Sequence, residues 1–215
     1  GTGSEAPMGS VITDQSSHRK IDVVSPLMAP HMSLVDPLLT QSLPASLTGS
    51  TGMDALTHSV EGYTATLASP LTDAIHFKAI ELLGASLLKA YQDGNDKSAR
   101  SNVMMASMIA GIGFPNSGLG SVHGLSLPLG GHFNIPHGVA NAIMLPYVMR
   151  FNIEACPQKF IDIAKALGAT NVTPEGAVEA VIDLSKALQI PSLRSYKVED
   201  KDLARLAKDA LGRNS

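Results

Sequence analysis

The chain has 215 residues, of which 44% are hydrophobic, so it can bury a sizeable core and is too apolar to be disordered. Its net charge is −3, its pI is near 6.2 and its longest basic run is "HRK" at 18–20, which argues against nucleic acid and anionic membranes as partners. No segment approaches the roughly 18 unbroken apolar residues of a membrane span, and no secretory signal pattern is visible.

The first 46 residues have the pattern of short strands. The β-branched runs "GSVITD" and "KIDVVS" flank the polar stretch "DQSSHRK", which predicts a β-hairpin. The run "HMSLVDP" predicts a third short strand that ends at Pro37. Strands this few and short do not form an independent sheet, so we interpret the segment as the edge of a sheet whose other strands are absent.

From residue 47 onward the spacing of apolar residues predicts helices, as Met53, Leu56 and Val60 illustrate. Ser69 followed by Pro70 is typical of a helix start. The predicted helices cover 47–67, 71–91, 97–114 (ended by Pro115), 119–133 (interrupted by Pro128), 136–152 (started by Pro136), 157–168 (ended by Gly168), 175–189 (opened by Thr173 and Pro174) and 199–211. The segment 103–114 has almost no charged face, which predicts a helix in the interior of a bundle.

The single cysteine, Cys156, excludes a disulfide framework and a cysteine-based zinc site within one chain. It precedes Pro157 at a helix boundary and no histidine or asparagine motif partners it, so we interpret it as structural. One thiol also fits a reducing compartment, and we expect a cytoplasmic protein.

The stretch "TGMDALTHSVEGY" places Asp54 and His58 four residues apart in an apolar helical run, so both side chains point the same way. Glu61, seven residues after Asp54, lies on nearly the same stripe. Taken alone, an aspartate and a histidine at this spacing form a local hydrogen-bonded pair more often than a metal site.

The segment "SVHGLSLPLGGHFNIPHGVANA" favours a metal site instead, because it holds His123, His132 and His137 among apolar and glycine residues. An aspartate with several imidazoles and no thiolate suits Fe²⁺, Zn²⁺ or Mn²⁺. A metallohydrolase would use the same ligands, but the His-Glu-x-x-His motif of many such enzymes is missing.

The stretches "GTGSE", "TGMDALTHSVEGY", "GLGSVHGLS" and "NIPHGVANAIMLP" resemble the iron-containing (group III) alcohol dehydrogenases over essentially the whole chain. The resemblance implies a dehydroquinate-synthase-like fold, with an α/β nucleotide-binding domain, an all-helical metal domain and a cleft between them. It therefore implies a mainly α chain, with residues 1–46 as the end of the nucleotide domain and 47–215 as a helical metal-binding domain truncated at its C-terminus.

The resemblance also implies site residues. Its metal ligands fall on Asp54, His58, His123 and His137, around Fe²⁺ or alternatively Zn²⁺ or another divalent metal. His132 and Glu61 are not ligand positions; the first would line the cleft or be structural, and the second would support a ligand or pack the helix. The residues implied for NAD or NADP binding are Gly1, Thr2, Gly3 and Ser4 of the glycine-rich loop, with Lys20 and Leu38.

Two departures from the family pattern matter. The Gly-Gly-Gly-Ser phosphate loop and its βαβ unit are missing, and the final helices are cut short, so we interpret the chain as a fragment that is itself inactive. Leu127 stands where the family usually has a second histidine, four residues after His123, which faces the substrate and nicotinamide. No catalytic residue is therefore expected beyond the metal site.

The function that follows from the resemblance is a metal-dependent, NAD(P)-linked alcohol dehydrogenase or aldehyde reductase. The metal would act as a Lewis acid on the alcohol oxygen, and hydride would pass to the nicotinamide. The expected partner is a small alcohol or aldehyde, without nucleic acid or membrane, and the full-length form is expected to be a homo-oligomer. The alternatives are a metal- and NAD-dependent lyase of the same fold and a non-catalytic helical metal-binding fragment.

Overall fold

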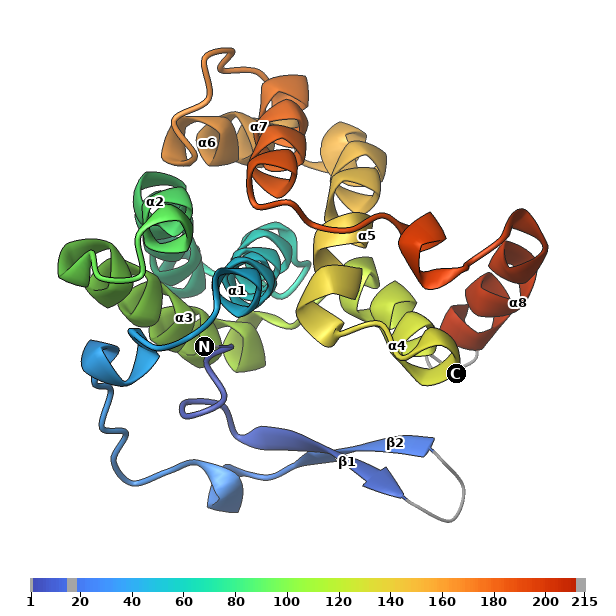
Figure 1. Cartoon of the computed structure of the whole chain (residues 1–215), viewed down its shortest axis with the longest axis horizontal. Coiled ribbons are helices and arrows are strands. Elements are labelled where there is room, and N and C mark those ends of the chain that lie inside the picture. Colours follow the sequence, from blue (N-terminus) through green and yellow to red (C-terminus); the bar gives the residue numbers. More distant parts are fainter. Residues whose placement is uncertain (1, 15–18, 212–215) are drawn as a thin grey trace.

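The computed structural model describes residues 2–14 and 19–211 and is dominated by helices, with a small β-hairpin along one edge (Figure 1). The strands are β1 (Gly9–Asp14) and β2 (Arg19–Val24). The α-helices are α1 (Ala45–Thr64), α2 (Pro70–Gln92), α3 (Lys97–Ser117), α4 (Ser121–Phe133), α5 (His137–Asn152), α6 (Pro157–Ala166), α7 (Pro174–Ala187) and α8 (Asp200–Leu211). Short 3-10 turns occupy Pro26–Met28, Pro37–Thr40, Ile153–Ala155 and Leu193–Tyr196. The mainly α fold class expected from the sequence is confirmed.

The predicted hairpin is present, with β1 and β2 antiparallel and in register from Gly9 opposite Val24 to Asp14 opposite Arg19. The predicted third strand at 31–37 is wrong, because these residues have irregular backbone until Pro37 begins a 3-10 turn. Within the described part of the chain, β1 and β2 pair only with each other, and the segment 31–37 joins neither of them.

Several helix ends lie where the sequence signals predict them. Ser69 caps α2 through its side chain, and Thr173 accepts a hydrogen bond from the backbone N–H of Gly176 at the start of α7. Gly168 follows the end of α6 with a φ of 69°, the left-handed conformation that glycine adopts without strain.

Two prolines were expected to break helices and do not. Pro128 lies inside α4, which continues from Ser121 to Phe133, and α3 runs two residues beyond Pro115. A proline removes one backbone hydrogen bond from a helix. Pro128 and its neighbour Leu129 are buried, and we attribute the uninterrupted helix to that burial.

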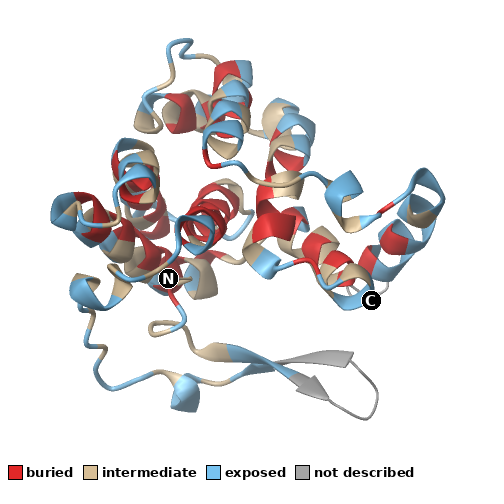
Figure 2. Cartoon of the chain, in the orientation of Figure 1, coloured by how far each residue is buried: buried red, intermediate tan, exposed pale blue. Residues whose placement is uncertain are grey.

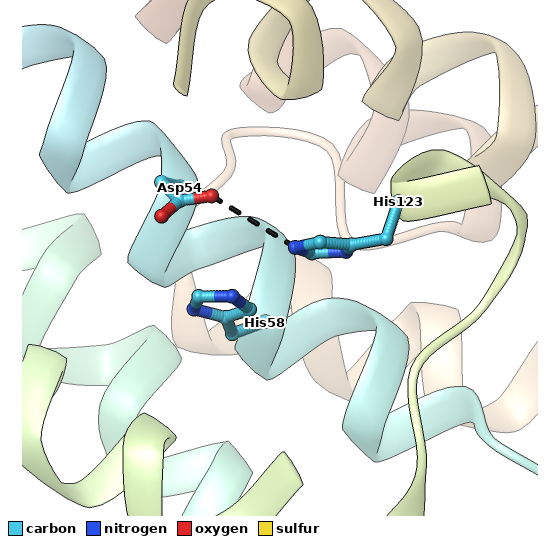
Figure 3. A group of neighbouring side chains, drawn as sticks. All are labelled: Asp54, His58 and His123. Carbon is cyan, nitrogen blue, oxygen red and sulfur yellow. Dashed lines mark ion pairs between the residues drawn. The ribbon is translucent and has the colours of Figure 1, made fainter. Parts of the chain in front are cut away.

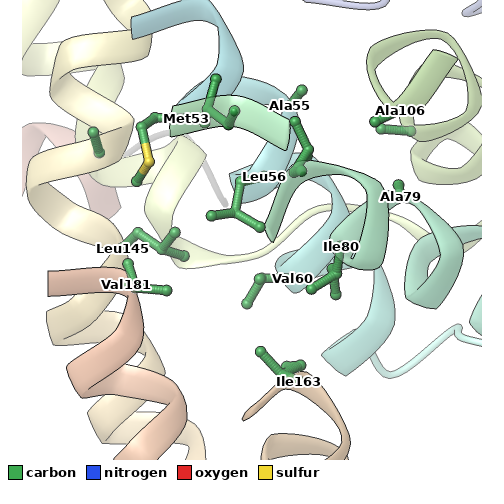
Figure 4. Close-up of a cluster of buried hydrophobic side chains, with 14 of the residues drawn as sticks. Met53, Ala55, Leu56, Val60, Ala79, Ile80, Ala106, Leu145, Ile163 and Val181 are labelled. Carbon is green, nitrogen blue, oxygen red and sulfur yellow. The ribbon is translucent and has the colours of Figure 1, made fainter. Parts of the chain in front are cut away.

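The core is organised around α1, which runs through the middle of the helical body and packs against α2, α3, α5 and α6 (Figures 1 and 2). Met53, Leu56 and Val60 on α1 meet apolar side chains from these neighbours (Figure 4). We expected 103–114 to be the interior helix, but α3 leaves Met105 and Ile112 exposed. Gly52 and Gly62 of α1 leave no room for a Cβ beside Leu87 and His76, so these glycines let α2 pack closely against α1.

Two hydroxyl groups in this buried helix are satisfied locally, since Thr57 and Ser59 donate to backbone carbonyls one turn back. The N-terminus of α5 approaches α1 so closely that a Cβ on Gly138 would overlap the carbonyl oxygen of Ser50. This glycine therefore allows the contact that brings the first turn of α5 beside the middle of α1.

None of the helices in the described ranges is both long and apolar enough to cross a membrane.

Candidate metal centre

Asp54 and His58 lie one turn apart on α1, and both are buried. His123 reaches toward them from α4 (Figure 3). One ligand-type atom from each of these three residues lies within 4.8 Å of the other two. Two residues on one helix and one on another therefore present an oxygen and two imidazole nitrogens to a common point.

His137, the first residue of α5, adds a third imidazole. Its Nε2 lies 3.5 Å from Asp54 Oδ1, while Nε2 of His123 lies 3.9 Å from the same oxygen. The rings of His58 and His123 stack with centroids 4.7 Å apart, and the rings of His123 and His137 are 5.3 Å apart. The four side chains singled out in the sequence therefore gather at the junction of α1, α4 and α5.

The cluster also contains a residue that the sequence analysis did not single out, Asn141 on α5. Its Nδ2 donates to Asp54 Oδ1 at 2.6 Å and lies 3.2 Å from Nε2 of His123 and 3.1 Å from Nε2 of His137. An amide NH₂ group has two hydrogens, so it can donate to two of these three atoms at a time. The available signal was the position of Asn141 one turn after His137, on the same face of the predicted helix.

Burial keeps His58 neutral. Desolvation lowers its pKa to about 4, although the charge of Asp54 acts in the opposite direction. Its ring stacks on Phe114 with centroids 4.7 Å apart, and its Nδ1 is buried without a hydrogen-bond partner among the described residues. A neutral imidazole with a lone pair available is the form that binds a metal.

The donor set and its spacing fit a divalent ion. Ligands about 2.0–2.3 Å from an ion at tetrahedral angles lie roughly 3.3–3.8 Å from each other. Of the two distances from Asp54 Oδ1, the 3.5 Å to His137 falls within this range and the 3.9 Å to His123 lies just above it. A carboxylate with several imidazoles suits Fe²⁺ or Zn²⁺, and the single cysteine lies outside this cluster.

Other residues named from the sequence have different surroundings. Glu61 contacts His123 through its carboxylate, in line with a supporting role. His132 lies near the end of α4, where its Nε2 is 2.8 Å from the carboxylate of Asp209 on α8, so it is a surface residue outside the cluster. Leu127 is half-buried on α4, one turn after His123. Cys156 is half-buried at the start of α6, and desolvation raises its pKa.

The residues expected to bind the dinucleotide lie in and around the N-terminal segment. Gly1 lies outside the described residues, and only the backbone of Lys20 is described, in β2. Gly3 packs its backbone against α3, where a Cβ would overlap the carbonyl oxygen of Ser107, while Thr2 is half-buried and Ser4 is exposed. Leu38 is exposed in the 3-10 turn that precedes α1.

The sequence model of the "Fe-containing alcohol dehydrogenase family, C-terminal" matches residues 48–215. The chain is 41% identical to the lactaldehyde reductase of Escherichia coli (strain K12), covering 98% of this chain and 56% of that protein. It is 42% identical to the 1,3-propanediol dehydrogenase of Klebsiella pneumoniae, with the same two coverages. The chain thus spans little more than half the length of these relatives.

Solved structures show the same similarity in three dimensions. A crystal structure of a 1,3-propanediol oxidoreductase superposes with a TM-score of 0.95 and 42% identity, covering 99% of this chain and 57% of that one. The sulfoacetaldehyde reductase from Bifidobacterium kashiwanohense, solved in complex with NAD⁺, superposes with a TM-score of 0.89 and 31% identity, covering 98% of this chain and 56% of that one.

Proposed function

The chain belongs to the Fe-containing alcohol dehydrogenase family, and we propose that it forms the metal-binding part of an NAD(P)-linked alcohol dehydrogenase or aldehyde reductase. The observation that carries the proposal is the cluster of Asp54, His58 and His123, with His137 beside Asp54 and His123, where three helices meet. Iron bound there would supply Lewis-acid polarisation of the substrate oxygen, and nicotinamide would accept or donate the hydride.

The protein residues contribute position and charge. The carboxylate of Asp54 and three neutral imidazoles would hold a divalent ion and leave the centre with a net positive charge, which favours an alcohol oxygen that is losing its proton. The ring of Phe114 covers one face of His58 and keeps water from it. Each ligand is carried by a helix, so its position is set before substrate binds.

The proposed ligands differ in solvent exposure, and this difference indicates the side from which substrate approaches. The side chain of Asp54 is 1% exposed, that of His123 is 13% exposed and that of His137 is 40% exposed. We infer that the centre is closed on the side of α1 and that the alcohol or aldehyde approaches past His137. The open coordination position that a catalytic metal needs would lie on that side.

Other parts of the chain would bind the cofactor, and the composition bears on the cellular compartment. Residues 1–46 would form the end of a nucleotide-binding domain, with Thr2, Gly3 and Ser4 approaching the phosphates of NAD or NADP and residues 47–215 forming the metal domain. The exposed turn with Leu38 lies near the end of the first part, shortly before α1. The single cysteine fits a cytoplasmic protein, and we propose a homo-oligomer in the full-length form.

The test is a matched pair of alanine variants in the full-length protein, meaning this chain with any flanking sequence its gene encodes. Asp54→Ala should lose bound Fe²⁺ or Zn²⁺, measured by elemental analysis, together with alcohol-dependent NADH formation. His132→Ala removes an imidazole outside the cluster and should retain both metal and turnover. Equal turnover in metal-free Asp54→Ala and wild type would reject the proposed function.

A further inference from the structure

Glu61 is a buried carboxylate on α1, 4% exposed, and both of its oxygens are engaged by α4. Oε1 accepts a hydrogen bond from the backbone N–H of Val122 at 2.6 Å. Oε2 lies 2.5 Å from Nδ1 of His123. The carboxylate therefore binds the first turn of α4 and one of the proposed metal ligands at the same time.

The second contact determines which nitrogen of His123 carries the proton. An ionised carboxylate only accepts hydrogen bonds, so the short contact to Oε2 requires an N–H at Nδ1. In the neutral ring, Nε2 then carries the lone pair. Nε2 is the nitrogen that lies 3.9 Å from Asp54 Oδ1 and 3.2 Å from Nδ2 of Asn141, so the lone pair is on the side of the ring that faces the cluster.

The first contact fixes the helix that carries His123. The N-cap residue of α4 is Gly120, which has no side chain to bond the free N–H groups of the first turn. Glu61 supplies that acceptor from another helix. A Cβ on residue 120 would lie 2.7 Å from Oε1 of Glu61, so a glycine at this position leaves room for the carboxylate.

We propose that Glu61 is a positioning residue that holds His123 in the tautomer with the proton on Nδ1, and thereby sets the metal affinity of the centre. The inference rests on the proposed function for its second half, since it takes His123 to be a metal ligand. Groups that hold a metal-ligating histidine in this way typically change metal affinity about 10–100-fold when they are replaced.

The decisive variant is Glu61→Gln, which keeps the shape and replaces one acceptor oxygen with an NH₂ donor. If the amide oxygen accepts from Val122, the NH₂ faces Nδ1 of His123, so the proton moves to Nε2 and the lone pair turns away from the cluster. We expect long-range ¹H–¹⁵N spectra of chelator-stripped, ¹⁵N-histidine-labelled full-length protein to show this change. Zn²⁺ affinity, measured by competition with a chelating dye, should fall about 10–100-fold.

Two further variants separate positioning from general damage. Gly120→Ala leaves the carboxylate of Glu61 intact but crowds it. This variant should lower Zn²⁺ affinity, as Glu61→Gln does. Ser117→Ala removes the hydroxyl 2.9 Å from Nε2 of His76, a buried histidine outside the proposed ligand set, and should leave Zn²⁺ affinity unchanged.

The outcomes also separate this inference from the proposed function. A wild-type His123 with its proton on Nε2, or an unchanged tautomer or Zn²⁺ affinity in Glu61→Gln, would overturn the inference. Wild-type protein that binds no metal would contradict the proposed function, and the spectra of the metal-free protein would still decide the tautomer. Should Glu61→Gln fail to fold, as judged by circular dichroism, Gly120→Ala provides the same comparison.

Discussion

Nδ2 of Asn141 lies 2.6 Å from Oδ1 of Asp54, which joins the first turns of α5 to a carboxylate 87 residues earlier in the chain. The same nitrogen is within hydrogen-bonding distance of Nε2 of His123 and of His137. A neutral donor is thus placed among acceptors that would otherwise face one another. Asn141 therefore stabilises the arrangement of the ligands in the metal-free chain.

Asn141→Ala should accordingly destabilise the metal-free protein by about 1–3 kcal/mol, because buried acceptors lose their donor. A metal ion would satisfy the same acceptors, so added Zn²⁺ should raise the melting temperature more in the variant than in wild type. Asn102→Ala is the matched control, since it removes an amide that donates to Ser86 between α3 and α2. Equal melting-temperature increments in Asn141→Ala and wild type would contradict this role.

Leu127→His should change the kinetics of the full-length protein without changing its metal content. Residue 127 follows His123 by one turn of α4, so the two side chains point the same way. A histidine there could relay a proton, an effect of about 10²–10⁴-fold at most. We expect higher turnover and an altered pH profile between about pH 6 and 10. An unchanged profile would show that position 127 carries no relay.

His76 should make the folded state sensitive to acid. Its side chain is completely buried, Nε2 lies 2.9 Å from the hydroxyl of Ser117, and desolvation lowers its pKa to about 4 from the ordinary value of 6.5. Between these pH values the unfolded chain binds more protons than the folded chain, so stability falls as the pH falls from about 6.5 to 4.

His76→Gln should therefore reduce the pH dependence of stability by roughly 2–3 kcal/mol across that window. Urea unfolding of metal-free protein at several pH values measures this pH dependence of the free energy of unfolding. His58 titrates in both proteins and cancels in the comparison. The same loss of stability on acidification in both proteins would exclude His76 as its source.

The 215-residue chain alone should show no measurable alcohol-dependent NADH formation and a tendency to associate. Around the hairpin and the segment that follows it, Val24, Leu27, Met32 and Leu34 are between 75% and 95% exposed. Exposed apolar patches favour association. Light scattering coupled to gel filtration, together with a spectrophotometric assay, measures both properties. A stable monomer with steady turnover would disprove the prediction.

The features that the sequence predicted correctly are local. The hairpin of β1 and β2, the cap of α2 at Ser69 and the end of α6 at Gly168 each depend on residues within a few positions of one another. The placement of Asp54 and His58 on one helix face follows from the helical repeat alone. The family motifs added the expectation that two more histidines belong with them.

The features that depend on packing between distant segments had to come from the tertiary structure. The segment 31–37 has the residues of a strand but remains irregular, and within the described chain it pairs with neither β1 nor β2. Pro128 removes one hydrogen bond from α4, and its burial is a property of the assembled core.

In the proposed metal centre, too, some features could be predicted from the sequence and others depend on the tertiary structure. The sequence named four ligands, but the bond from Asn141 to Asp54 and the two contacts from Glu61 to α4 join residues 61–87 positions apart. No periodicity relates such positions. They meet because Gly138 and Gly120 let α5 and the start of α4 come close to α1, and only the packed helices determine that approach.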